Sequence, residues 1–377
     1  MMRLLPLVLL GACAPPDPGA LFTSATARVL PDGQATDALL IDAIDAAKDS
    51  LHVALPAAED TGISDAILRA FDRGVDIQVL TDVDREGDPG ITALIDAGVP
   101  VSLADGGMTY FDFTTSRDVT WTSDQVRMTD CWVVTDGLRV VGCTLAGSLQ
   151  GGPRVAFDVK GEEIAEDVLG EHNQIFGGTD ATALTSFSNP AKSILDLNAT
   201  YPNTDDTRVG VWFGPQERLT KRVIDAIYGA RSSIRVLTDD LSNDGLARAL
   251  QDKAKNGFDV TVITGPHFGL ASSVQAREYE NGTPDVDKFA RTDVDQLPTV
   301  ILIDFEDTRL GQRSLAKAMV LTHDLVSSAR IWKGSEVVSD QVLDGTLWSL
   351  EDSDEPSPEM IDLLALFEDQ LALAEEL

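Results

Sequence analysis

Two cysteines stand at the ends of the segment CWVVTDGLRVVGC, residues 131–143, where a disulfide or a reactive thiol would be possible. Asp136-Gly137 favours a tight turn between two flanks rich in β-forming residues. A three-residue loop, residues 136–138, would set Cys131 directly opposite Cys143, within the distance that a disulfide spans. A two-residue loop would leave Cys143 diagonal to Cys131. We predict the first arrangement, and with it a cross-strand disulfide.

The alternative is that Cys131 acts as a nucleophile. A reactive thiol needs a nearby base or cation that lowers its pKa, and the neighbouring sequence offers only Arg127 and Arg139. The compartment also matters, because two cysteines outside the cytoplasm are expected to pair where geometry allows.

The chain has only 4 histidines, at positions 52, 172, 267 and 323. We expect His52 to lie within a strand and His172 to be exposed on a helix. His267 and His323 follow predicted strand ends, and loops at strand ends commonly line the functional sites of α/β folds. These two are therefore candidate acid–base residues. No spacing of metal-ligating residues and no glycine-rich phosphate loop is present, so we expect no metal and no cofactor.

The elements that would position these residues are repeated. Residues 41–81 align without a gap on residues 224–264, and the glycines Gly62 and Gly74 fall on Gly245 and Gly257. Each copy reads as helix, strand, helix, strand. Such alternation predicts an α/β unit with a largely parallel or mixed sheet flanked by helices.

The sequence of each copy resembles that of a known family. VLPDG at 29–33 and AILRAFDRGVDIQVLTD at 66–82 resemble the opening of a phospholipase D superfamily domain, and residues 155–176 are similar to that family's closing strand and helix. The resemblance covers most of the chain after residue 25. It implies two tandem α/β domains packed as a pseudo-dimer. The expected boundaries are a first domain at 25–178, a linker at 179–208 and a second domain at 209–377.

Members of this family cleave or transfer phosphodiesters, with one His-x-Lys-x4-Asp motif in each half. One histidine attacks phosphorus, the other protonates the leaving group, and the lysines hold the phosphate oxygens. In the first half of this chain Thr129 stands at the histidine position and Cys131 at the lysine position, while Asp136 is kept and Gly142-Cys143 comes near the Gly-Ser position.

In the second half the counterpart is the segment SLAKAMVLTHD. There Leu315 stands at the histidine position, Lys317 is kept, Thr322 takes the aspartate position, and the Gly-Ser strand begins late, at Gly334-Ser335. Both motif histidines are missing. We therefore expect a non-catalytic or weakly active binding or scaffold protein. The alternative is an active phosphodiesterase, on phospholipid or nucleic acid, with relocated groups such as His267 and His323. A working site of that kind would gather Lys317 with further cations.

The N-terminus predicts export. Residues 1–12 read as a signal peptide, and Leu10-Gly11-Ala12-Cys13 resembles the lipobox of bacterial lipoproteins, in which the cysteine is lipidated. Residues 13–24 would then be a tether, and Cys13 would anchor the protein to a membrane of the bacterial envelope through lipid. An ordinary secretion signal with a coincidental cysteine is the other interpretation.

The charge limits the partners. With 62 acidic and 29 basic residues the formal net charge is −33, so the protein's own field repels nucleic acid. We expect no nucleic-acid partner. A well-solvated surface suited to salty surroundings explains this acidity, and the sequence does not specify a protein partner or a ligand.

Overall fold

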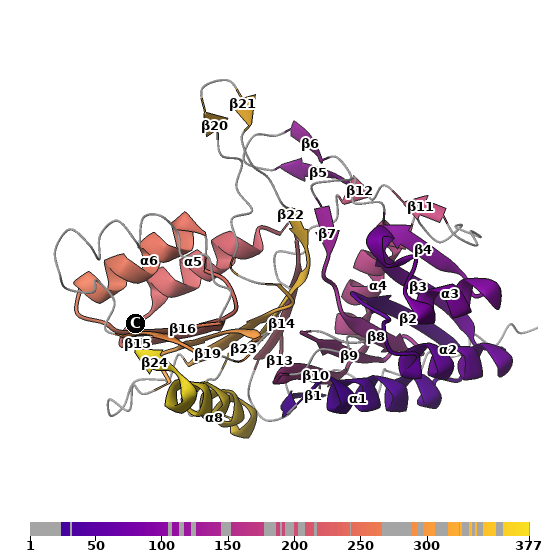
Figure 1. Ribbon diagram of the computed structural model, residues 1–377, viewed down its shortest axis with the longest axis horizontal. Coiled ribbons are helices and arrows are strands. Elements are labelled where there is room, and N and C mark those ends of the chain that lie inside the picture. The colour runs from indigo at the N-terminus through magenta and orange to yellow at the C-terminus, as the bar shows by residue number, and fades with distance from the viewer. Residues whose placement is uncertain are drawn as a thin grey trace, which may run out of the picture.

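The structure is a computed structural model, and it describes residues 24–30, 32–104, 108–112, 117–121, 126–144, 152–176, 186–188, 191–192, 200–202, 208–214, 217–241, 243–265, 288–292, 294, 297–305, 316–323, 325, 332–333, 336–337, 342–351 and 357–376. Figure 1 shows two units side by side, each a twisted sheet flanked by helices. The fold-class prediction is confirmed.

The first unit is built on an eight-stranded mixed sheet. From one edge to the other its strands are β1 (Ser24–Leu30), β10 (Arg154–Lys160), β9 (Arg139–Cys143), β8 (Trp132–Thr135), β2 (Ser50–Leu55), β3 (Asp76–Asp82), β4 (Val101–Ala104) and β11 (Ser186–Ser188). Strands β2, β3, β4 and β11 run parallel, and the others pair antiparallel. One face is covered by α1 (Gly33–Ala46), α2 (Gly62–Asp72) and α3 (Pro89–Asp96), and the other by α4 (Glu162–Phe176). A short 3₁₀ turn, Val83–Arg85, follows β3.

The second unit repeats this plan on a nine-stranded sheet. Its strands are, in order, β13 (Thr200–Pro202), β14 (Arg208–Phe213), β23 (Thr346–Glu351), β19 (Lys317–Leu321), β18 (Thr299–Ile303), β15 (Ser233–Thr238), β16 (Asp259–Thr264), β17 (Lys288–Arg291) and β24 (Glu375–Glu376). Helices α5 (Leu219–Gly229) and α6 (Asp244–Lys255) cover one face and α8 (Pro358–Leu373) the other.

The helices begin and end where their sequences indicate. Asp32 and Ser357 accept hydrogen bonds from backbone N–H groups three residues later, and so cap α1 and α8. Gly74 and Gly257 have φ values of 82° and 81° just after α2 and α6, in the region that glycine adopts without steric cost. The aligned glycines of the repeat are thus two equivalent helix stops.

The inner faces of both sheets, together with α4 and α8, form one shared hydrophobic core. At its centre the rings of Phe157 and Trp348 stack with centroids 5.2 Å apart, and Trp132 meets Phe213 edge to face at 5.9 Å. The two units are therefore packed against each other through buried aromatic contacts.

Several short strands lie outside the two large sheets. β5 (Met108–Asp112), β6 (Arg117–Trp121) and β12 (Ala191–Lys192) form a small sheet, and β20 (Trp332–Lys333) pairs with β21 (Glu336–Val337). β7 (Val126–Met128) pairs in parallel with β22 (Val342–Asp344) across the two units. The predicted linker is more than a connection, since β11 and β13 within it extend the edges of the two sheets.

Candidate functional site

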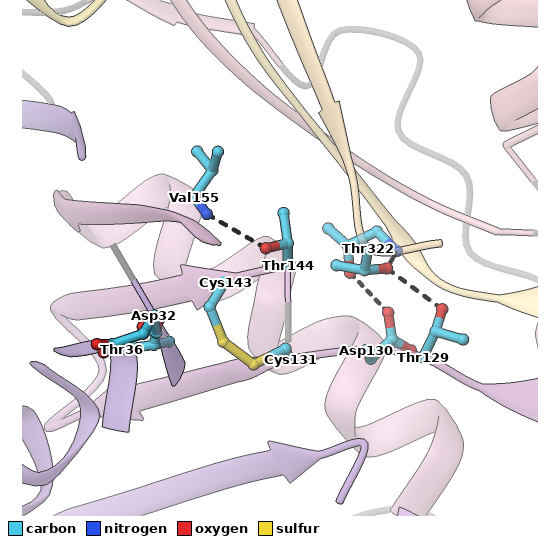
Figure 2. Close-up of a disulfide and its surroundings, with 10 residues drawn as sticks. Asp32, Thr36, Thr129, Asp130, Cys131, Cys143, Thr144, Val155 and Thr322 are labelled. Atoms are coloured by element: carbon cyan, nitrogen blue, oxygen red, sulfur yellow. Dashed lines mark hydrogen bonds between the residues drawn. A yellow bond between two sulfur atoms is a disulfide. The ribbon is translucent and has the colours of Figure 1, made fainter. Parts of the chain in front are cut away.

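The hairpin of β8 and β9 carries the predicted disulfide. Cys131 and Cys143 are bonded, with their Cα atoms 5.3 Å apart and both side chains buried (Figure 2). Thr135 pairs with Arg139, so the loop has the three residues that place the cysteines opposite each other. The disulfide prediction is confirmed. A cysteine bonded in this way carries no free thiolate, so the nucleophile alternative does not apply to the oxidised protein.

Asp136 closes the turn of this hairpin and anchors the neighbouring strand. It has a φ of 53°, and its carboxylate accepts hydrogen bonds from the backbone N–H groups of Lys48, Asp49 and Ser50, at the start of β2. Partial burial raises the pKa of this carboxyl, but the three N–H donors together outweigh it and leave the pKa below its ordinary value. The motif aspartate therefore has a structural role.

Asp304 anchors the corresponding strand in the second unit. It has a φ of 60°, and its carboxylate accepts from the N–H groups of Arg231, Ser232 and Ser233, at the start of β15. Because β15 corresponds to β2, Asp304 is the structural counterpart of Asp136. The motif aspartate of the second half is kept, at a different position from the one the sequence suggested.

This correspondence assigns the second motif to different residues. Counting back from Asp304 with the spacing of the family motif places Leu297 at the histidine position and Thr299 at the lysine position. The assignment of Leu315, Lys317 and Thr322 to the motif is therefore corrected. The segment that connects β18 to β19 is long, whereas the first half connects the equivalent strands with three residues. Counting along the sequence therefore placed the second motif on the wrong strand.

Lys317 lies at the end of β18 and β19 opposite to the motif position Thr299. It pairs across β18 with Ile303, just as Arg139 pairs across β8 with Thr135. Its ammonium group contacts Glu351 at 2.5 Å, and Arg139 likewise binds Asp158 at 2.9 Å. Lys317 is thus the counterpart of a structural arginine and does not reach the motif positions.

The positions of the motif lysines hold neutral groups. The Thr299 hydroxyl is buried and bonded to that of Thr238 at 3.0 Å, and Leu297 lies in the shared core. With Cys131 in a disulfide, neither half places an ammonium group where the family's lysine would hold a phosphate oxygen.

Thr129, at the first histidine position, lies where the two units touch. Its hydroxyl is 3.3 Å from that of Thr322, which follows β19. Next to it (Figure 2), the buried carboxylate of Asp130 lies at the same contact. It accepts a hydrogen bond of 2.6 Å from the Thr346 hydroxyl of β23. These bonds connect the units directly through side chains, in place of a pair of histidines. Sequence reasoning missed Asp130 and Thr346, and gave Thr322 the role of the motif aspartate.

His323 is the one predicted substitute that the described structure places here. A Cβ on Gly345 would lie 2.4 Å from the Thr129 hydroxyl, 2.7 Å from the His323 ring and 2.8 Å from the Thr322 hydroxyl. These groups therefore surround the same point. His267, Ser335 and Cys13 lie outside the described residues. Among the described residues, no group of three or more His, Cys, Asp or Glu side chains is arranged to hold a metal ion.

Comparison with known proteins agrees with this geometry. Residues 40–120 match the family described as "Cardiolipin synthase, PLD-like domain". The chain contains a phospholipase D-like domain. Its fold is similar to that of phosphatidylserine synthase from Haemophilus influenzae Rd KW20, with a TM-score of 0.60 and 13% identity over 93% of this chain and 87% of that one.

The polyphosphate kinase of Porphyromonas gingivalis is also similar, with a TM-score of 0.56 and 11% identity over 92% of this chain and 50% of that one. At such identities these two likenesses concern the fold alone. No curated protein sequence is significantly similar to this chain. No helix within the described part of this chain is long and apolar enough to cross a membrane.

Proposed function

We propose that this chain is a non-catalytic binding or scaffold protein that keeps the phospholipase D-like architecture without its phosphodiester chemistry. One observation carries the proposal: the four positions that the family fills with histidine and lysine hold Thr129, Cys131, Leu297 and Thr299. None of these side chains supplies an imidazole nucleophile or a permanent cation for phosphate.

The surroundings of these positions support the same conclusion. Cys131 is held in a disulfide, and Leu297 and Thr299 are buried. The partner of Thr346 is the buried carboxyl group of Asp130, so this position offers no positive charge to a phosphodiester. The same groups now hold the units together, so the former catalytic interface serves as a structural junction.

The test is hydrolysis of bis-p-nitrophenyl phosphate by the purified chain. We expect no turnover above that of buffer, at any pH from 5 to 9, beside a phospholipase D with intact motifs as positive control. Turnover that survives repeated purification and disappears on a substitution in this chain would overturn the proposal.

A second candidate function rests on His323. Its ring shares the space beside Gly345 with the hydroxyls of Thr129 and Thr322, so it is the described imidazole best placed to act on a substrate between the units. This alternative is an active phosphodiesterase with relocated groups. It predicts turnover that His323→Ala abolishes and Lys317→Ala, at the far end of the strands, leaves unchanged.

We also propose that the protein is exported and held at a bacterial membrane through lipid on Cys13. The buried disulfide supports export, because disulfides persist mainly outside the reducing cytoplasm. Labelling of growing cells with a radioactive fatty acid tests it. We expect label in the wild-type protein and none in Cys13→Ser, and equal release of both proteins into the medium would contradict the anchor.

A further inference from the structure

Two histidines of the first unit, one buried and one half-buried, form a pair that the proposed function does not use. His172 of α4 is fully buried, and its ring meets that of His52 on β2 edge to face with centroids 5.1 Å apart. The expectation that His172 is exposed is wrong, because α4 turns this residue toward the sheet. The ring of His172 also stacks on Phe176 at 5.9 Å.

The pair connects to the contact between the units through one indole. Nε1 of Trp132 donates a hydrogen bond of 3.4 Å to Nδ1 of His172. The same indole ring packs edge to face on Phe213 of β14 in the second unit. Trp132 therefore contacts the histidine pair on one side and the second unit on the other.

This hydrogen bond requires a neutral imidazole. Nδ1 of His172 accepts a hydrogen bond only while this nitrogen is unprotonated. Nε2 of His172 and Nδ1 of His52 are buried atoms without a hydrogen-bond partner among the described residues, so no described acceptor there compensates an added proton. A charged ring there would be buried among aromatic groups.

We propose that His52, His172 and Trp132 form an acid-sensitive contact that couples α4 to the junction between the two units. A proton taken from solvent by His172 occupies the Nδ1 lone pair and ends the Trp132 bond. The charged ring then moves toward water, which displaces α4 and loosens the packing of Trp132 on Phe213. This inference stands apart from the proposed function and holds whether or not the chain is an enzyme.

The surroundings of the pair favour the neutral form of both histidines. Burial lowers the pKa of His172 well below its ordinary value, and a charge on His52 lowers it further. Burial also lowers the pKa of His52, which the carboxylate of Asp76 on β3 partly opposes. On α4 and β3 two further buried acids, Glu171 and Asp82, are engaged elsewhere, and Glu162, Glu163 and Glu166 are exposed. Glu171 accepts a bond from Gln174, and Asp82 accepts from Met128.

The sign of the pH effect follows from these directions. Above the unfolded-state pKa of histidine, about 6.5, both states are neutral and the stability is unaffected. Below it the unfolded chain binds protons that the folded chain does not, so stability falls as the pH falls. For each histidine kept neutral, the unfolding equilibrium constant rises up to about tenfold per pH unit.

The experiment compares urea unfolding of the full chain at pH values from 8 to 5 with His172→Asn, whose amide oxygen accepts the Trp132 bond without titrating. His323→Asn is the matched control, since it removes a histidine away from α4. We expect the wild type and the control to lose stability below pH 6.5 and His172→Asn to lose up to about tenfold less per pH unit. Equal slopes for all three would overturn the proposal.

A second readout reports the contact itself. In folded wild-type protein the indole N–H resonance of Trp132, assigned with Trp132→Phe, is expected to stay constant while His172 is neutral and to shift only once the pH falls below the lowered pKa of His172. In His172→Asn it is expected to stay constant throughout. If His172→Asn does not fold, the ring resonances of His172 in the wild-type protein are followed through the pH titration instead. A His172 that titrates near 6.5 in the folded protein, with no shift at Trp132, would contradict the acid-sensitive contact.

Discussion

Asp136 and Asp304 are equivalent residues in the two halves of the chain, and each anchors the start of the strand beside its hairpin. Each has a positive φ and each accepts from three successive backbone N–H groups, 48–50 for Asp136 and 231–233 for Asp304. The aspartate of the family motif thus remains where the histidine and lysine are gone. Its retention is explained by the backbone that it satisfies.

Removing either carboxylate is expected to cost stability. Asp136→Ala leaves three N–H groups without their acceptor, and a hydrogen bond to a charged group contributes about 1.5–3 kcal/mol. We expect a loss of about 2–4 kcal/mol in urea unfolding for Asp136→Ala or Asp304→Ala. Asp136→Asn keeps an acceptor oxygen and should lose less. Asp72→Ala, on the exposed end of α2, is the control and should change little.

The Asp136 carboxylate also gives a pH dependence in the acid range. Its pKa in the folded protein is depressed, so it stabilises the fold fully above the unfolded-state pKa of aspartate, about 3.9. That contribution is lost as the pH falls through the lower, folded-state pKa. Wild-type stability should therefore fall more steeply below pH 4 than that of Asp136→Asn, and parallel curves would contradict the assignment.

The disulfide is expected to act as a brace of the first hairpin. It closes a loop with a sequence separation of 12, for which the chain-entropy estimate is about 2–3 kcal/mol. Replacing both Cys131 and Cys143 with alanine should lower the free energy of unfolding by about that amount or more, since both side chains are buried. The oxidised wild type is measured beside wild type unfolded and refolded with a reductant, and an equal stability of the two would refute the brace.

The first half of the site could be predicted from the sequence because its pattern is local. The spacing of Cys131, Asp136 and Cys143 is fixed by a three-residue turn, so strand pairing follows from counting. The second half lacks that constraint. Between Asp304 and Lys317 the chain is long, and only the strand register shows that Lys317 belongs opposite Ile303.

The junction of the two units depends on contacts that no local pattern encodes. The bonds of Thr129 with Thr322 and of Asp130 with Thr346 join residues that are far apart in sequence. The burial of His172 has the same origin. An amphipathic helix predicts a buried face, but which residues at its margin are covered depends on how α4 is rotated against the sheet.

The acidity of the chain predicts a response to salt. With 62 acidic against 29 basic residues, repulsion within the compact state exceeds that in the expanded chain. Added salt screens this repulsion, with a Debye length of about 10 Å at 0.1 M and about 3 Å at 1 M. We expect the thermal midpoint to rise as NaCl increases from 10 mM to 1 M. A midpoint that is constant or falls over this range would mean that attractive ion pairs such as Arg139–Asp158 outweigh the repulsion.

Gly345 is expected to control how closely the two units approach around Thr129, Thr322 and His323. A methyl group there would lie within 3.0 Å of atoms of Thr129 in the first unit and of Thr322 and His323 in the second, so Gly345→Ala forces these side chains to shift. We expect a loss of about 1–3 kcal/mol, measured by urea unfolding, together with weaker coupling between the units.

Gly170→Ala is the matched control, because a Cβ at this helical position of α4 meets nothing within 4 Å. There alanine should stabilise by up to about 1 kcal/mol, since glycine loses more backbone entropy in a helix. Opposite signs for the two substitutions indicate a closed junction around Thr129. If Gly345→Ala were as stable as the wild type, space would remain between the units at this point, which would favour a substrate-binding role for His323 over a purely structural junction.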